Sequence, residues 1–355
     1  MTDLDGRLLA AAGGWLAGQG IGNGVLENPV VLQGGTQNIL IRFTAAGRDL
    51  VLRRPPKSPR PRNNELLLRE ATVLRALGST PVPHPRLVAV CEDTEILGGA
   101  VFYIMEAIDG FNPAAVEPAR LADRFVRDRI AFAATDILAD IGALDHESIG
   151  LSEFGRPEGF LERQVGRWSA ERDAQLRLNG YPGEPLPGYD VVREYLDAER
   201  PDGFRAGLMH GDYHVGNLIV GEQFDVRAVI DWEMSTVGDP LLDLGRFLAL
   251  WPDEHEVIVD RGGFWTAGPL PGVDELAERY ARRRGIRLDH LDWYIVMGCF
   301  KLGVVLEGTY ARACAGQAPL PTGELLHTVA VRLFRRAARL AGSSTRSTSV
   351  PRRAL

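Results

Sequence analysis

The chain has 355 residues, of which 45% are hydrophobic and 25% charged, and its formal net charge is −7. These values are ordinary for a soluble globular protein, and the length is sufficient for two lobes with separate cores. The negative charge disfavours a general nucleic-acid-binding protein, and no apolar run reaches the ~18 residues of a membrane helix. We therefore expect neither a nucleic acid nor a membrane as partner.

The cysteines and the N-terminus indicate the compartment. The three cysteines lie far apart and form no Cys-x-x-Cys pair, which favours reduced, buried thiols over disulfides or zinc. The first residues are acidic and lack the basic segment that precedes the apolar core of a secretory signal. These features predict a cytoplasmic protein.

The first third of the chain predicts a β-rich lobe. Its apolar residues alternate as in strands, apart from two segments with helical spacing. In chain order we expect a helix over residues 8–17, three strands within residues 30–54, a helix over residues 64–77, and strands over residues 86–91 and 101–105. Together these elements predict an N-terminal lobe over residues 1–106, with an antiparallel sheet and one key helix.

The rest of the chain predicts a larger, mainly helical lobe over residues 107–340. Helical spacing of apolar residues indicates helices over residues 128–144, 274–284, 292–312 and 324–340. The last segment, residues 341–355, has almost no apolar content, and we expect it to be disordered. The fold class is therefore α+β, with a small β-containing lobe and a larger helical one.

The stretch from His210 to Asp243 carries the strongest chemical signal. Asn217 follows Asp212 by five residues, and a short apolar hairpin then leads to Asp231. Phosphoryl transfer from ATP needs a carboxylate that takes or orients the hydroxyl proton of the acceptor, and oxygen ligands for Mg²⁺. Asp212 fits the first role, and Asn217 with Asp231 fits the second.

With Asp-Trp-Glu at 231–233 and Gly-Asp-Pro-x-x-Asp at 238–243 in register, the stretch resembles the aminoglycoside phosphotransferase-like family, a distant relative of protein kinases. The resemblance covers roughly residues 30–340. It implies a protein-kinase-like two-lobed fold and an ATP- and Mg²⁺-dependent transfer of the γ-phosphate to a hydroxyl group of a small molecule. It also implies that Asp243 braces the catalytic loop, which carries Asp212 and Asn217, through backbone hydrogen bonds. His210 is expected to form a hydrogen bond within this loop.

The nucleotide end of the resemblance lies in the first lobe. Gly34 and Gly35 stand between two apolar strands, where glycines let backbone amides approach phosphate oxygens. Arg53 occupies the place of the lysine that holds the α- and β-phosphates in kinases, and Glu70 is its natural partner. Either Arg53 itself binds the phosphates through its planar guanidinium group, or Lys57 or Arg54 contacts them instead.

The strand that ends at Glu106 resembles the segment that joins the lobes in the family. An adenine base would form hydrogen bonds with the backbone at Glu106 and Ile108, so the side chains there are free to vary.

The acceptor is the least constrained part of the prediction. Residues 52–56, 163–168 and 300–312 resemble the kinase-like domains that are fused to some acyl-CoA dehydrogenases. The segment from Arg261 to Leu340 contains twelve lysines and arginines and only seven aspartates and glutamates. A cationic aminoglycoside would require carboxylates, so this balance favours an anionic acceptor such as a hydroxyacyl-CoA over an aminoglycoside or another small alcohol. Candidate acceptor residues are Arg163, Arg167, Trp168, Phe300 and Arg312.

Two functions of other classes compete with a kinase. His210, Asp212, His214 and Asp231 could form a metallohydrolase cluster, but they lack the His-x-His or His-Glu-x-x-His spacing that places two imidazoles on one metal. A non-catalytic nucleotide-binding module, or pseudokinase, is favoured only by the arginine at position 53. The retained Asp212, Asn217 and Asp231 favour an active enzyme.

Overall fold

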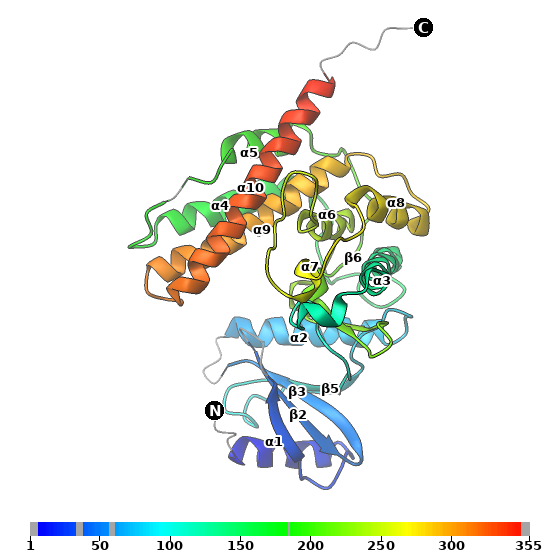
Figure 1. Ribbon diagram of the computed structural model, residues 1–355. Coiled ribbons are helices and arrows are strands. Elements are labelled where there is room, and N and C mark those ends of the chain that lie inside the picture. Colours follow the sequence, from blue (N-terminus) through cyan, green and yellow to red (C-terminus); the bar gives the residue numbers. More distant parts are fainter. Residues whose placement is uncertain (1–5, 33–37, 57–60, 184, 349–355) are drawn as a thin grey trace. The chain divides into compact units, whose positions relative to one another are not determined.

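The computed structural model describes residues 6–32, 38–56, 61–183 and 185–348 (Figure 1). The chain forms two compact units. The first consists of Met1–Phe111, Ile149–Leu151 and Asn217–Ser235, and the second of Asn112–Ser148, Ser152–Gly216 and Thr236–Leu355. Because the hairpin that carries Asn217 and Asp231 belongs to the first unit, the boundary differs from the one that we expected at residue 106.

The first unit is built on an antiparallel five-stranded sheet with the strand order β1-β2-β3-β5-β4. Its strands are β1 (Glu27–Leu32), β2 (Ile39–Ala45), β3 (Arg48–Arg54), β4 (Leu87–Cys91) and β5 (Phe102–Glu106). Ala46 and Gly47 form the two-residue turn between β2 and β3, and both have positive φ angles, 52° and 69°. Such a turn matches the twist of the strands that it joins.

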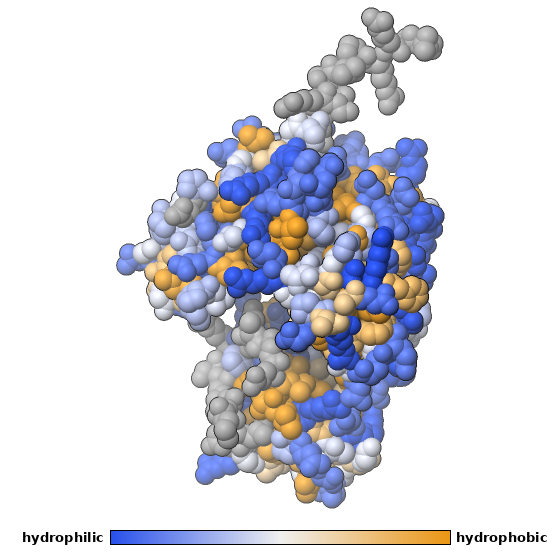
Figure 2. Space-filling view, viewed as in Figure 1, coloured by the Kyte–Doolittle hydropathy of each residue, from blue (hydrophilic) through white to orange (hydrophobic). Residues whose placement is uncertain are grey.

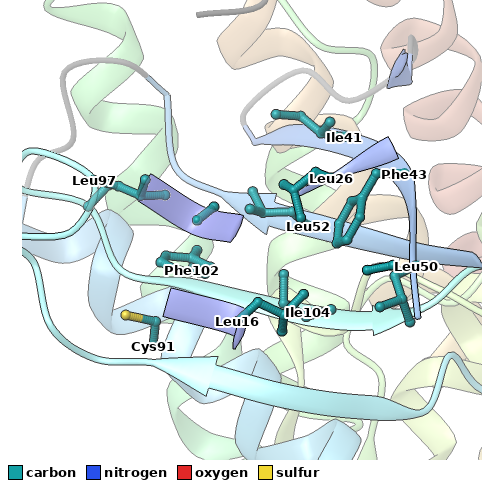
Figure 3. Close-up of a cluster of buried hydrophobic side chains, with 13 residues drawn as sticks. Leu16, Leu26, Ile41, Phe43, Leu50, Leu52, Cys91, Leu97, Phe102 and Ile104 are labelled. Atoms are coloured by element: carbon teal, nitrogen blue, oxygen red, sulfur yellow. The ribbon is translucent and has the colours of Figure 1, made fainter. Parts of the chain in front are cut away.

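Two helices cover opposite faces of this sheet, α1 (Gly6–Gly18) and α2 (Pro61–Leu77) (Figure 1). Side chains along a strand alternate between faces. Leu50 and Leu52 of β3 accordingly lie in the apolar cluster on the α1 side, with Leu16 and Ile104 (Figure 3). Arg53, one residue further, is on the side of α2. The strand register thus delivers a buried cation to the helix that carries Glu70.

The hairpin of β7 (Leu218–Val220) and β8 (Val226–Val229) is bonded to the first unit at several points. Phe111 and Val220 exchange backbone hydrogen bonds of 2.8 and 2.9 Å, and the Val229 amide donates to Pro83 O at 2.9 Å. Gly110 permits this approach, because a Cβ atom there would lie 2.5 Å from Val220 O. The hairpin leads into a short 3₁₀ turn, η3 (Trp232–Met234).

The second unit is mainly helical, with one short antiparallel pair of strands and a 3₁₀ turn. Its elements are η1 (Pro118–Leu121), α3 (Arg124–Ala143), α4 (Glu162–Leu176), α5 (Tyr189–Ala198), β6 (Gly207–Met209), β9 (Thr236–Gly238), α6 (Leu241–Ala249), α7 (Gly263–Thr266), α8 (Val273–Arg284), α9 (Leu291–Cys314) and α10 (Leu320–Thr348). A further 3₁₀ turn, η2 (Val215–Asn217), lies at the passage to the first unit.

Helix α9 is the central helix of the second unit. Most of its residues are buried, and α6 approaches it closely because two glycines face each other: a Cβ atom on Gly245 would lie 2.0 Å from Tyr294 O, and one on Gly298 would lie 2.6 Å from Gly245 O. This contact brings the polar residues of α6 next to those of α9. It therefore positions the candidate site described below.

By length and composition, α9 could cross a membrane, but 72% of its most apolar window is buried inside the protein. Such burial is typical of the core helix of a globular protein. Hydrophilic residues cover much of the face of the second unit that Figure 2 shows, with hydrophobic residues scattered between them.

The C-terminal helix differs from our expectation. Disorder was predicted from residue 341, but α10 continues to Thr348, and only residues 349–355 lie outside the described part of the tail. The segment after residue 340 contains no proline before Pro351. A packed helix can therefore propagate through its serines, threonines and arginine, since each added residue gains a backbone hydrogen bond without a new nucleation step.

Candidate active site

In the first unit, Arg53 joins three carboxylates. Its Nε lies 3.0 Å from Glu70 Oε2, and its Nη2 lies 2.7 Å from Asp231 Oδ1 and 3.4 Å from Glu233 Oε2. Asn38 donates to the same Glu233 oxygen, with 3.2 Å between its Nδ2 and Glu233 Oε2. The arginine expected at the phosphate position is therefore paired with the expected glutamate, and in addition it holds Asp231.

Glu70 is buried and contacts both Arg53 and the turn that follows Asp231. Besides its ion pair with Arg53, it accepts a hydrogen bond of 3.2 Å from the amide of Trp232, so α2 is linked directly to the turn after Asp231. Burial raises the pKa of the Glu70 carboxyl to about 7, while the Arg53 guanidinium opposes this shift. The carboxylates around Arg53 raise its pKa above the ordinary value, although burial opposes them. Arg53 is therefore charged at every physiological pH.

Asp231 has a backbone conformation that few residues adopt. Its φ and ψ angles, 67° and 58°, are left-handed, which aspartate tolerates better than most residues. The turn is held by hydrogen bonds from Trp232 Nε1 to Val229 O at 3.0 Å and from the Ser235 amide to Trp232 O at 3.0 Å. Strain of this kind persists only where the surroundings fix it, and it is frequent at functional sites.

The residues expected to bind Mg²⁺ fit that ion in chemistry and position. The amide of Ile230 donates to Asn217 O at 2.9 Å, so Asn217 lies beside the chain that enters Asp231. Both side chains offer the hard oxygen atoms that Mg²⁺ prefers, and the Asp231 side chain is 38% exposed. Over the described ranges no three His, Cys, Asp or Glu residues form a metal cluster. Mg²⁺ commonly uses one or two protein carboxylates together with phosphates and water, and Asp231 would supply one such carboxylate.

The remaining nucleotide residues are only partly described. Gly34, Gly35 and Lys57 lie outside the described residues. Arg54 is buried and donates through Nε to Pro55 O at 3.0 Å, which occupies it locally and favours Arg53 for the phosphates. The amide of Glu106, at the end of β5, donates to Arg86 O at 2.9 Å. A contact between adenine and Glu106 would therefore use its carbonyl group, and Ile108 follows two residues later.

In the second unit, Asp243 of α6 accepts two backbone hydrogen bonds from the catalytic loop. Its Oδ2 lies 2.6 Å from the His210 amide, and its Oδ1 lies 3.0 Å from the Gly211 amide. Within the loop, the Asp212 amide donates to His210 Nδ1 at 3.3 Å. His210 and Asp243 are both buried, and burial raises the pKa of the Asp243 carboxyl. The loop that precedes Asp212 is thus held at its backbone amides, by the Asp243 carboxylate and by the His210 ring.

The carboxylate of Asp212 lies among cations. Its Oδ1 accepts from Arg246 Nη2 at 2.8 Å, and its Oδ2 lies 3.6 Å from His214 Nε2. Burial opposes ionisation, but Arg246, His214 and Lys301 outweigh it and hold the pKa of Asp212 well below its usual range. Because 39% of this side chain remains exposed, the carboxylate is ionised and accessible to an acceptor.

Four of the five candidate acceptor residues lie at three separate places. Arg167 and Trp168 of α4 lie beside Lys301: the Arg167 guanidinium is 5.0 Å from the centre of the Trp168 ring, and the Lys301 ammonium is 5.6 Å from it. Arg163 donates to the carbonyl groups of Glu158 and Arg156. Arg312 is exposed and bonded to Thr309 at 3.0 Å. Only Arg167 and Trp168 are therefore brought near the catalytic loop.

Phe300 requires a correction. We expected its ring to offer apolar surface to an acceptor, but its side chain is fully buried and packs against Tyr189 and Phe334, with ring centres 5.5 and 5.9 Å away. Helix α9 is apolar on most of its circumference, so the sequence did not reveal which residues face the core. Phe300 is a core residue.

Three polar residues of the site were missed. Glu233 shares Arg53 with Asp231, Arg246 binds Asp212, and Lys301 donates from Nζ to Gly211 O at 2.5 Å. A sequence signal existed for Lys301, since it is one of only two lysines and interrupts an otherwise apolar helix. Charged residues are almost never buried without a partner, so its position already indicated one.

Comparison with known proteins identifies the family. The profile of the "Phosphotransferase enzyme family" matches residues 30–293. A protein from Ralstonia eutropha, provisionally described as an aminoglycoside phosphotransferase, has a structure that superposes with a TM-score of 0.73 at 24% identity, covering 94% of this chain and 98% of that one. The GDP complex of an aminoglycoside 2′-phosphotransferase-IIIa variant gives a TM-score of 0.59 at 16% identity, covering 90% and 94%. These likenesses show the protein-kinase-like fold.

The curated relatives are longer proteins. Acyl-CoA dehydrogenase family member 11 from Gallus gallus is 30% identical over 294 residues, which are 80% of this chain and 36% of that protein. Acyl-CoA dehydrogenase family member 10 from Mus musculus is 30% identical over 300 residues, which are 82% of this chain and 27% of that protein. The chain therefore spans about a third of the length of these relatives. It belongs to the phosphotransferase enzyme family.

Proposed function

We propose that this protein is an ATP- and Mg²⁺-dependent kinase that phosphorylates a hydroxyl group of a small anionic molecule, such as a hydroxyacyl-CoA. The observation that carries the proposal is the charge around the candidate base. Arg246, Lys301 and Arg167 act on or beside Asp212, while Asp212 and Asp243 are the carboxylates of this cluster. A site for a cationic aminoglycoside would need the opposite balance.

The first unit supplies the groups for the nucleotide. Arg53 presents a planar cation suited to phosphate oxygens, and Glu70 holds it in place. Mg²⁺ would be held by Asn217 and Asp231, and when bound it neutralises charge on the phosphates. Nucleotide complexes are known for members with this fold, among them a ternary complex of an aminoglycoside phosphotransferase with ADP and hygromycin B, with a TM-score of 0.54 at 14% identity.

The second unit supplies the base. Asp212 accepts a hydrogen bond from the acceptor hydroxyl, whose oxygen attacks the γ-phosphorus as the bond to the ADP oxygen breaks. The proton passes to Asp212. Because its pKa is lowered, Asp212 is a weak base that mainly orients the hydroxyl and takes the proton late, as a loose transition state allows. Asn217 is five positions after Asp212, so the chain itself limits their Cα distance to at most ~18 Å.

The chemistry of the acceptor is supported by the cationic residues and by the names of the relatives. Arg167 is exposed and offers a guanidinium group, which binds phosphate and carboxylate well. The curated relatives are named for acyl-CoA, and a CoA thioester carries phosphates at one end and an acyl chain at the other. An acyl chain with a hydroxyl group would combine both requirements in one molecule.

The test is an acceptor screen with γ-labelled ATP that includes hydroxyacyl-CoAs, sugars, choline-like alcohols and kanamycin. We expect transfer to hydroxyacyl-CoAs that requires Mg²⁺ and is lost in Asp212→Ala. Binding of CoA in calorimetric titrations should weaken as salt increases, because salt screens the ionic contacts. Rapid phosphorylation of kanamycin with no transfer to an anionic acceptor would overturn the anionic part of the proposal. Nucleotide binding with no transfer to any acceptor would indicate a pseudokinase.

A further inference from the structure

A second charged residue besides Asp243 holds the catalytic loop. The carbonyl oxygen of Gly211 accepts a hydrogen bond from Lys301 Nζ at 2.5 Å, while the amide of the same residue donates to Asp243 Oδ1 at 3.0 Å. Gly211 has a φ angle of 84°, a left-handed conformation that favours glycine. The residue directly before the base is thus fixed at both of its backbone polar groups, by an anion from α6 and a cation from α9.

Stability alone does not account for a lysine at this position. Helix α9 is the core helix of the second unit, and burial lowers the pKa of Lys301, with Asp243 and Asp212 opposing this shift and Arg246 and Arg167 adding to it. Lys301 is half-buried, and its ammonium group loses part of its hydration there without entering the apolar core. A lysine placed here at that cost indicates a function, and the atom that it binds belongs to the catalytic loop.

Lys301 also connects the loop to the helix that bears the acceptor candidates. Its ammonium lies 5.6 Å from the centre of the Trp168 ring, within the range of a cation–π interaction. Trp168 belongs to α4, and its buried Nε1 has no hydrogen-bond partner within the described structure. A buried donor of this kind is costly unless a ligand or water satisfies it. The chain of contacts therefore runs from α4 through Lys301 to the backbone of the base.

We propose that Lys301 is a positioning residue of the transfer reaction. Lys301 anchors the Gly211 carbonyl, and the orientation of Asp212 thereby depends on the contact between Lys301 and Trp168. The inference rests on the proposed kinase function, because it concerns the geometry of Asp212 towards the acceptor hydroxyl. The hydrogen bond from Lys301 goes to a backbone atom of the loop, Gly211 O. Its loss should therefore lower the rate of transfer while the affinity for the nucleotide is preserved.

The test compares Lys301→Met, Lys301→Gln and Lys301→Arg. Met removes both charge and donor at similar length, Gln keeps a donor without charge, and Arg keeps both. We expect kcat of Lys301→Met to fall about 100-fold, the loss expected when a catalytic group is misplaced by ~1 Å, with the KM for the nucleotide unchanged. Arg should recover most of this loss and Gln part of it. Arg282→Met, which removes an exposed cation of α8 that pairs with Glu278, is the matched control and should keep the wild-type kcat.

Hydrogen exchange gives a readout that does not depend on the acceptor. The amides of His210 and Gly211 should exchange faster in Lys301→Met, while those of α3 should not change. If the wild-type protein phosphorylates no acceptor, the proposed function is wrong. If the amides of His210 and Gly211 exchange as slowly in Lys301→Met as in the wild type, the anchoring role is wrong, whatever the acceptor result. A wild-type kcat in Lys301→Met also overturns the proposal. The proposal is also overturned if Lys301→Met lowers kcat and raises the nucleotide KM by the same factor, and Lys301→Arg does not restore either value. If Lys301→Met does not fold, the Gln and Arg variants decide by the same criteria.

Discussion

Replacing Arg53 by Met should destabilise the first unit as well as impair nucleotide use. Arg53 and Glu70 are almost fully buried, with side chains 9% and 2% exposed, and their atoms lie 3.0 Å apart. Removing one partner of such a pair leaves an uncompensated buried charge, which typically costs about 3–5 kcal/mol. The same change frees Asp231 from its 2.7 Å contact, so the KM for ATP should rise or kcat should fall.

The loss of stability should depend on pH, with a sign that follows from Glu70. Burial already raises the pKa of Glu70 to about 7, above its ordinary value of 4.5, and without Arg53 the pKa rises further. A carboxyl group with a raised pKa in the folded state stabilises the fold below the unfolded pKa, and this contribution is lost as the pH rises through the folded pKa. The destabilisation by Arg53→Met should therefore be larger at pH 8 than at pH 6.

Urea unfolding at both pH values measures this effect, with nucleotide binding measured in parallel. Arg48→Met is the matched control on β3, because Arg48 pairs with Glu106 at 3.2 Å with both side chains more than a third exposed, and such pairs contribute at most ~1 kcal/mol. Adding Glu70→Gln to Arg53→Met removes the orphaned charge but keeps an acceptor for Trp232, and should restore part of the stability. If the double variant unfolds as easily as Arg53→Met, or if Arg53→Met costs no more than Arg48→Met, the reasoning is wrong.

Further predictions concern the second unit and the thiols. Asp212→Ala should lower turnover about 10²–10⁴-fold with little change in nucleotide affinity, and a wild-type rate with the true acceptor would exclude Asp212 as the base. Burial raises the pKa of the Cys299 thiol to about 11 and also raises the pKa of the Cys91 thiol. Only Cys314, which is partly exposed, should therefore react quickly with a thiol reagent at pH 8. More than one fast-reacting thiol would contradict the fold. Gly245→Ala should lower the unfolding free energy by at least ~1–3 kcal/mol, because its Cβ would lie 2.0 Å from a carbonyl oxygen of α9, and a neutral result would show that α6 and α9 are less tightly packed.

The amino-acid sequence by itself determined what depends on short spacing and alternation. The order Asp212, Asn217 and Asp231 around a hairpin is a local pattern, and so is the alternation that turned Arg53 away from Leu52. The pairing of Arg53 with Glu70 was also predictable, since the strand register and the following helix leave few alternatives. Element types were predicted well for the same reason, because the apolar spacing of 2.0 or 3.6 residues is set by the backbone itself.

The tertiary structure decided what depends on which elements pack together. Lys301 and Gly211 are far apart in sequence, and no periodicity indicates that an ammonium on α9 binds the loop before Asp212. Phe300 was misplaced because α9 is apolar on most of its circumference, so the sequence does not indicate which of its apolar residues face the core. The hairpin joined the first unit because Phe111 and Pro83 bond its strands, a pairing between distant backbone groups that side-chain patterns do not encode. Local order follows from neighbouring residues, but the partner of a buried charge is chosen by the fold.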